Sequence, residues 1–95
     1  MKYLNKLVDE HPTLMISKPG CVFCTQAKKL FDKKMKNVHV MEIEKMKSDE
    51  AAEVIGAVRD EYKHMTFPII FVDGEFIGGY DDLKEFYESD KENEL

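Results

Sequence analysis

The sequence predicts a single α/β domain over residues 1–95, with a four-stranded mixed sheet flanked by helices. Three observations indicate this fold class. The first half of the chain predicts a strand, a helix and a second strand in succession, which is a right-handed unit with two parallel strands. Asp73-Gly74 joins two short apolar runs and is a strong hairpin signal. A chain of 95 residues is long enough for one modest core and no second domain.

The first elements are predicted by the spacing of apolar residues. Such residues recur at helical spacing between Tyr3 and Val8, so we expect a short amphipathic helix that ends near His11-Pro12, where proline disfavours continuation. Residues 14–16 form a brief apolar run and predict a strand. Residues 17–20 have the composition of a turn.

A second helix is expected from Cys21 to about Lys36. Its apolar positions step by three or four residues and are Ala27, Leu30, Phe31 and Met35. Residues 38–43 then alternate apolar and polar side chains, with β-branched content, and predict a strand. This strand should pair in parallel with the first, because a helical crossover joins the two.

A third helix is expected to open at Ser48 or Asp49, either of which would cap it. Its inward face is predicted to comprise Ala51, Val54, Ile55, Val58 and Tyr62. Residues 69–72 and 75–77 flank Asp73-Gly74 and should form the two antiparallel strands.

The last helix is expected after Gly78-Gly79, with Asp81-Asp82 as its caps, since carboxylates accept the free N–H groups at a helix N-terminus. Its inward residues are predicted to be Leu83, Phe86 and Tyr87. Residues from about 89 to 95 are expected to be flexible.

The composition is that of an ordinary globular protein, with 43% apolar and 35% charged residues. A net charge of -5 argues against nucleic acid as the main partner, because phosphate backbones bind basic surfaces. Charged residues interrupt the N-terminal segment too often for a signal peptide, and no run approaches transmembrane length. We therefore expect no membrane partner and a cytoplasmic or other reducing location.

The two cysteines of the chain, Cys21 and Cys24, enclose only Val22 and Phe23 at the expected start of a helix. A thiolate attacks disulfides, so a redox cysteine needs a pKa below its ordinary value of about 8.5. The N–H groups at a helix start favour negative charge, and Lys18 lies three residues before Cys21. Cys21 is therefore the better placed nucleophile.

Cys24 lies one turn into the helix, on the same face as Ala27 and Phe31, and should be more buried than Cys21. That position suits a second thiol, which attacks after Cys21 has formed a mixed disulfide.

Two other uses of these cysteines stay open. A single cysteine is often just a small buried apolar residue, and a Cys-x-x-Cys pair can bind zinc. Structural zinc takes four ligands, whereas His11, His39 and His64 are scattered without a paired spacing. The position of the motif, at a helix start after a strand, favours redox chemistry.

Four segments together resemble the glutaredoxin family, over a stretch from about Leu14 to Tyr87. The segments are Ser17-Lys18-Pro19-Gly20-Cys21-Val22-Phe23-Cys24, Ala27-Lys28-Lys29-Leu30-Phe31, Thr66-Phe67-Pro68, and Ile77-Gly78-Gly79-Tyr80-Asp81-Asp82-Leu83. The resemblance implies a thioredoxin-like fold, a dithiol active site and glutathione as the thiol partner. Thioredoxins themselves carry a tryptophan near the active site, and this chain has none.

The resemblance also assigns roles in glutathione binding. Pro68 would be a cis proline that presents the backbone of Phe67 to the cysteinyl unit. The N–H of Asp81 would bind the γ-glutamyl carboxylate, the side chain of Asp82 its ammonium, and Lys18 the glycine carboxylate. The expected substrate-binding residues are Lys18, Phe23, Thr66, Phe67, Pro68, Gly79, Tyr80, Asp81 and Asp82, beside the catalytic pair Cys21 and Cys24. Lys63 and His64 either assist at the glycine carboxylate or form a solvated helix end.

The implied function is a glutathione-dependent thiol-disulfide oxidoreductase that acts on protein disulfides and glutathionylated proteins as a monomer, with no tightly bound cofactor. One departure from the family pattern matters: Val22-Phe23 stands where many dithiol members carry Pro-Tyr. Some members with other dipeptides bind a [2Fe-2S] cluster between two protomers, so cluster storage or transfer through Cys21 is the alternative. A redox-inert adaptor with the same fold is a third hypothesis.

Overall fold

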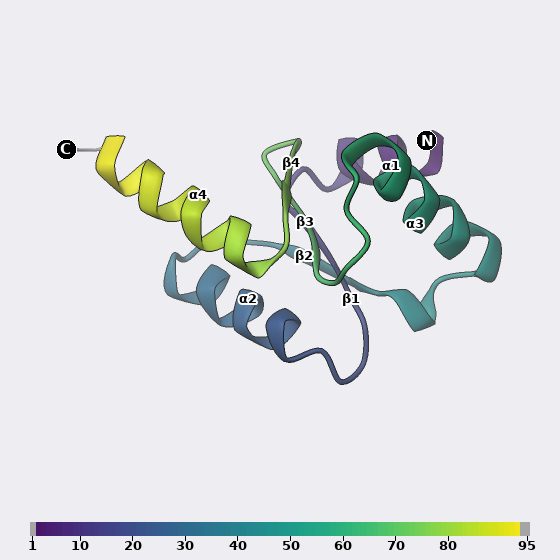
Figure 1. Ribbon diagram of the computed structural model, residues 1–95, viewed down its shortest axis with the longest axis horizontal. Coiled ribbons are helices and arrows are strands. Elements are labelled where there is room, and N and C mark those ends of the chain that lie inside the picture. The colour runs from purple at the N-terminus through teal and green to yellow at the C-terminus, as the bar shows by residue number, and fades with distance from the viewer. Residues whose placement is uncertain (1, 94–95) are drawn as a thin grey trace.

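A computed structural model describes the backbone of residues 2–93 and the side chains of residues 3–88. Helices cover both faces of one sheet, which gives three layers (Figure 1). The helices are α1 (Lys2–Glu10), α2 (Val22–Lys33), α3 (Ser48–Tyr62) and α4 (Tyr80–Asn93), with a short 3-10 helix η1 (Ile43–Lys45). The strands are β1 (Leu14–Ser17), β2 (His39–Glu42), β3 (Ile69–Val72) and β4 (Glu75–Gly78).

The sheet has the strand order β2-β1-β3-β4. β1 and β2 pair in parallel, whereas β1 with β3 and β3 with β4 pair antiparallel. The Asp73-Gly74 turn has positive φ at both residues, +51° and +88°, as a tight two-residue hairpin requires. The predicted four-stranded mixed sheet is confirmed.

Side chains alternate along the central strands and divide the core in two. Leu14 and Ile16 of β1 pack with residues of α1 and α3, whereas Met15 packs with residues of α2 and α4. Figure 1 shows the same division, with α1 beside α3 and α2 beside α4. Because both faces are covered, β1 and β3 are buried throughout and appear in the sequence as unbroken apolar runs.

Helix α2 ends earlier than expected. The N–H of Met35 donates to Asp32 and the N–H of Lys36 donates to Phe31, which is the pattern of a Schellman motif. Met35 is the left-handed residue of that motif, with φ +57°, and its side chain is 92% exposed. The predicted helix end at Lys36 and the inward placement of Met35 are therefore wrong, while Ala27 and Phe31 are buried as expected.

Helix α3 differs from expectation in its cap. Ser48 is already helical, and Lys47 precedes the helix without a capping side-chain bond. The Asp49 carboxylate accepts from the N–H of Glu50, inside the first turn. Neither predicted residue therefore occupies the cap.

The buried face of α3 consists of Val54, Ala57 and Val58, whereas Ile55 is 39% exposed. The predicted face was wrong at Ile55, because Val54, Ala57 and Val58 follow the i, i+3, i+4 spacing of one helical face and Ile55 lies outside it. Tyr62 at the end of the helix is 37% exposed and stacks on Phe76 of β4, with ring centroids 4.2 Å apart.

Helix α4 buries Leu83 and half-buries Phe86 and Tyr87, as predicted. The helix continues to Asn93. The side chains of residues 89–93 and all of residues 94–95, where we expected flexibility, lie outside the described part of the structure. Among the described helices, none is both long and apolar enough to cross a bilayer.

Two imidazoles stack at the start of β2. His39 pairs in the sheet with Leu14, at the end of β1 that lies away from the cysteines. The rings of His11 and His39 are 3.7 Å apart between centroids and almost parallel. Desolvation, and then the charge of His11, lower the pKa of His39 below its ordinary value of 6.5.

This pair predicts a loss of stability in mild acid. Since the pKa of His39 is lower in the folded state, the unfolded chain binds more protons as the pH falls through about 6.5, and the free energy of unfolding decreases. Urea denaturation between about pH 7 and pH 5 should show a steeper decrease for the natural protein than for His39→Gln. His11→Gln should give an intermediate slope, because desolvation of His39 remains. Parallel pH profiles for all three proteins would contradict this assignment.

Candidate active site

The first cysteine is placed by the end of β1 and the turn that follows it. Ser17 is buried, and Gly20 has φ +71°, which reverses the chain before α2. Cys21 is the N-cap of α2, in an extended conformation, and its Sγ accepts the backbone N–H of Cys24 at 3.2 Å. A sulfur in this position lies against the positive end of the helix, where a thiolate is stabilised. The predicted location of Cys21 is confirmed.

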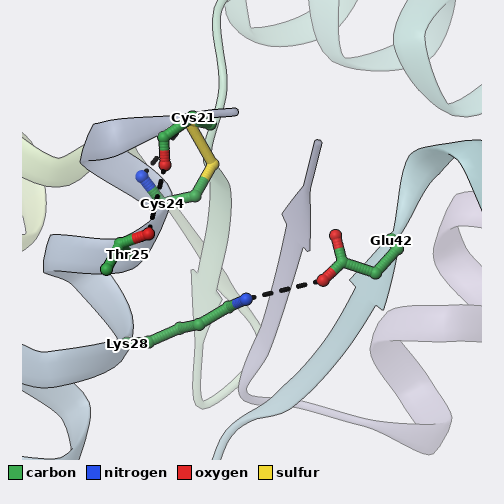
Figure 2. Close-up of polar contacts among 5 residues, drawn as sticks. All are labelled: Cys21, Cys24, Thr25, Lys28 and Glu42. Atoms are coloured by element: carbon green, nitrogen blue, oxygen red, sulfur yellow. Dashed lines mark hydrogen bonds and ion pairs between the residues drawn. A yellow bond between two sulfur atoms is a disulfide. The ribbon is translucent and has the colours of Figure 1, made fainter. Parts of the chain in front are cut away.

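Cys21 and Cys24 form a disulfide (Figure 2), with their Cα atoms 5.2 Å apart. Cys24 is only 2% exposed, whereas Cys21 is half-buried, so the expected difference in access is confirmed. Within the described residues, no group of three or more His, Cys, Asp or Glu side chains is placed to hold a metal ion.

The start of β3 lies beside the cysteines. The Phe67-Pro68 peptide bond is cis, as expected, and Pro68 is buried. The carbonyl oxygen of Phe67 is 3.7 Å from Cys21 Sγ. The backbone before the proline therefore lies next to the sulfur, although the two segments are far apart in the sequence.

The segment between β4 and α4 is fixed by one side-chain cap and by the first backbone bond of the helix. Oδ2 of Asp82 accepts the N–H of Gly79 at 2.9 Å, and the N–H of Leu83 donates to the carbonyl of Gly79 at 3.0 Å. Asp82 thus caps α4 from inside its first turn, whereas Asp81 is simply its second residue and not a cap. The expected cap is confirmed for Asp82 and wrong for Asp81.

A cavity of about 270 Å³, which we name the aromatic cavity, lies between these segments. It is lined by Phe23, His64, Thr66, Phe67, Gly79, Tyr80, Asp81 and Asp82. It thus brings together seven of the nine residues expected to bind glutathione. Of the other two, Pro68 is buried and Lys18 places its Nζ 5.5 Å from the ring centre of Phe67.

Lys63 and His64 differ in their environments. Nζ of Lys63 donates to the carbonyl of Asp60, so this side chain belongs to the end of α3. Nε2 of His64 lies 3.2 Å from the carbonyl oxygen of Pro68, and the ring lines the aromatic cavity. Of this pair, only His64 lines the aromatic cavity.

A second cavity, of about 370 Å³, contains both cysteines in its lining, and we name it the thiol cavity. The other lining residues are Ser17, Lys18, Pro19, Gly20, Val22, Thr25, Lys28 and Glu42. Nζ of Lys28 lies 3.4 Å from Oε1 of Glu42 and spans the space between α2 and β2 (Figure 2).

Lys28 and Glu42 were not among the site residues predicted from the sequence. Two signals could have found them. Lys28 follows Cys24 by one helical turn, and Glu42 pairs with Ser17 at the carboxyl end of a parallel strand. Parallel strands bring their carboxyl ends to the same edge of a sheet, which is where Cys21 follows β1.

A disulfide at the start of the helix after the first strand, beside a cis proline, defines a thioredoxin-like domain with a dithiol site. The glutaredoxin family profile matches residues 13–77. Glutaredoxin 1 of Rickettsia bellii is 35% identical over 85 residues, which cover 90% of this chain and 83% of the relative. Glutaredoxin-1 of Saccharomyces cerevisiae is 31% identical over 99 residues, covering 100% and 88%.

Solved structures agree with this match. The buckwheat glutaredoxin-glutathione complex has a TM-score of 0.84 at 27% identity, and the alignment covers 95% of this chain and 80% of that one. The chain belongs to the glutaredoxin family, whose members are thiol-disulfide oxidoreductases with a thioredoxin-like fold.

The cap of α4 predicts that Gly78 and Gly79 differ in their tolerance of a side chain. Gly78 has φ +123°, and a Cβ there would collide with the carboxylate of Asp82. Gly78→Ala should therefore lower the free energy of unfolding by about 1–3 kcal/mol, measured by urea denaturation. The matched control is Gly79→Ala, whose Cβ would lie 3.6 Å from Cε1 of His64, an ordinary contact. Equal losses in both variants would contradict this explanation.

Proposed function

We propose that this chain is a glutathione-dependent thiol-disulfide oxidoreductase that reduces glutathionylated proteins and protein disulfides. The observation that carries the proposal is the position of Cys21 Sγ. The sulfur accepts the N–H of Cys24 at the N-terminus of α2 and lies 3.7 Å from the carbonyl of Phe67, which borders the aromatic cavity. A similar protein, from buckwheat, was solved as a complex with glutathione.

In this proposal the tripeptide lies along the aromatic cavity. Its cysteinyl unit pairs with the backbone of Phe67 in the manner of an added strand, which brings its sulfur to Cys21. Its γ-glutamyl carboxylate binds the N–H of Asp81 at the N-terminus of α4, where anions are stabilised. One oxygen of Asp82 holds Gly79, and the other accepts from the ammonium.

Lys18 binds the glycine carboxylate at the other end of the tripeptide. Its exposed side chain reaches the ring of Phe67, which places the ammonium at the edge of the aromatic cavity. The rings of Phe23 and Tyr80, with centroids 6.2 Å apart, form the wall on the side of α2 and α4.

The reaction proceeds by two exchanges. The Cys21 thiolate attacks the glutathione sulfur of a mixed disulfide; the substrate sulfur leaves as a thiolate and takes up a proton from solvent. A second glutathione thiolate then attacks the glutathione sulfur that is bonded to Cys21, so that oxidised glutathione forms and Cys21 leaves as a thiolate. In the other branch, Cys24 attacks Cys21, releases glutathione and forms the observed disulfide.

The partners of the proposed reaction are glutathione and disulfide-containing proteins. We propose that the chain acts as a monomer, without a tightly bound cofactor, in the cytoplasm or another reducing compartment. There it would transfer electrons from glutathione to disulfides and so contribute to redox homeostasis.

Substitution of each cysteine tests the proposal. Cys21→Ser should lower glutathione-dependent reduction of hydroxyethyl disulfide by more than about a hundredfold, because it removes the nucleophile. Cys24→Ser should keep this activity, because glutathione can resolve the intermediate. Full activity in Cys21→Ser, with calorimetry showing no glutathione binding, would falsify the proposal.

The alternative function is a [2Fe-2S] cluster shared between two copies. It is favoured by the exposed apolar side chains Val22 and Phe23, 65% and 55% exposed, which border the active site and provide a surface for self-association. The described residues of a single copy contain no group of three metal-ligating side chains, so a cluster would require a second copy. Anaerobic purification decides: a coloured, iron-containing dimer supports this alternative, and a colourless monomer opposes it.

A further inference from the structure

The thiol cavity is lined by the buried cysteine and by a lysine from the same helix. Cys24 and Lys28 both line this cavity and are one helical turn apart, so their Cβ atoms are neighbours on one face of α2. The ammonium of Lys28 extends from that helix toward β2, where Glu42 holds it at 3.4 Å (Figure 2). Of the two residues in this ion pair, Lys28 is the one that lies in the same helix as Cys24.

Cys24 needs such a neighbour more than Cys21 does. A thiol must ionise before it attacks, and burial disfavours the charged form. Cys21 has the start of α2 and the N–H of Cys24 to stabilise its thiolate. Cys24 lies one turn further in and is 2% exposed, so these stabilising groups are less available to it.

The described charged residues that line the thiol cavity with Cys24 are Lys18, Lys28 and Glu42. They come from the loop before α2, from α2 and from β2, respectively. On its other side Glu42 borders a separate cavity with Lys45, Lys47 and Glu50. Among these residues, only Lys28 lies on the same face of α2 as Cys24. Its ammonium is also held in the thiol cavity by an ion pair with Glu42.

We propose that Lys28, held by Glu42, is a positioning residue that favours the Cys24 thiolate and so determines how often Cys24, rather than a second glutathione, resolves the mixed disulfide. The inference rests on the dithiol branch of the proposed function. In that step Cys24 loses its proton to solvent and attacks the Cys21 sulfur. The Cys21–Cys24 bond forms as the bond to the leaving thiolate breaks, and that thiolate takes up a proton.

A chromogenic aromatic disulfide, dithiobis-nitrobenzoate, isolates this step without requiring a glutathione site. The reduced protein should release one coloured thiolate when Cys21 attacks and a second when Cys24 closes the disulfide. Lys28→Met should slow the second release about fivefold near neutral pH and move its pH profile up by about half to one unit. Lys28→Gln repeats the test with a polar side chain, and Lys28→Arg should restore the natural rate.

Two further variants separate charge from structure. Lys29→Met removes the same charge from an exposed neighbour outside the thiol cavity and should leave the second release unchanged. Glu42→Gln keeps an oxygen that accepts from Lys28 but removes a negative charge, which would disfavour a nearby thiolate. The Cys21–Cys24 disulfide should therefore form as fast as in the natural protein or faster. An unaltered rate and pH profile in Lys28→Met, or equal slowing in Lys29→Met or Glu42→Gln, would overturn the proposal.

The same measurements distinguish this inference from the proposed function. If the protein does not bind glutathione but formation of the Cys21–Cys24 disulfide depends on Lys28, the proposed function is refuted and the role of Lys28 is retained. If the protein has glutathione-dependent activity but formation of this disulfide does not depend on Lys28, the proposed function is retained and the role of Lys28 is refuted.

Discussion

The structure depends on one constraint, which is that the chain must leave the carboxyl end of β1 and present a sulfur at the first turn of α2. Three features meet this constraint. β1 is buried between two strands, which fixes where it ends. Gly20 supplies a left-handed turn, and the N–H of Cys24 bonds to Cys21 Sγ. The cap is therefore both a structural element and the source of the chemistry, since the groups that begin the helix also stabilise a thiolate.

The disulfide lies where two cavities of different character approach each other. The aromatic cavity is lined by residues of α2, of the segment between α3 and β3, and of the start of α4 with the glycine before it, and it includes no lysine among its described lining residues. The thiol cavity contains both cysteines and the Lys28–Glu42 pair. Phe67 joins the two, because it lines the first and its carbonyl lies near Cys21 in the second. The residues proposed to bind the γ-glutamyl and cysteinyl units of glutathione and the Lys28–Glu42 pair proposed to act on Cys24 thus line different cavities, whereas Lys18, proposed to bind the glycine carboxylate, lines the thiol cavity.

Much of this arrangement was predictable from local signals. The Cys-x-x-Cys motif, the Asp73-Gly74 turn and the apolar runs of β1 and β3 each reflect short-range geometry, and all three were placed correctly. Met35 was misplaced because a Schellman motif, not periodicity, ends α2. The Lys28–Glu42 pair joins residues of two elements, so the contact between them follows from the packing of α2 against the sheet edge, although the position of each residue could be inferred from the sequence.

The dipeptide between the cysteines has two opposing effects on the start of α2. Val22 is the first helical residue, and a proline in that position would fix the backbone but contribute no N–H. Valine retains the N–H, which is one of the first four donors of a helix and has no partner within it. The start of the helix therefore carries one more unpaired backbone N–H, and so more positive charge, than it would with proline, while the first turn loses the rigidity of the proline ring. The first effect favours the thiolate, and the second lets the turn adjust when Cys21 exchanges partners.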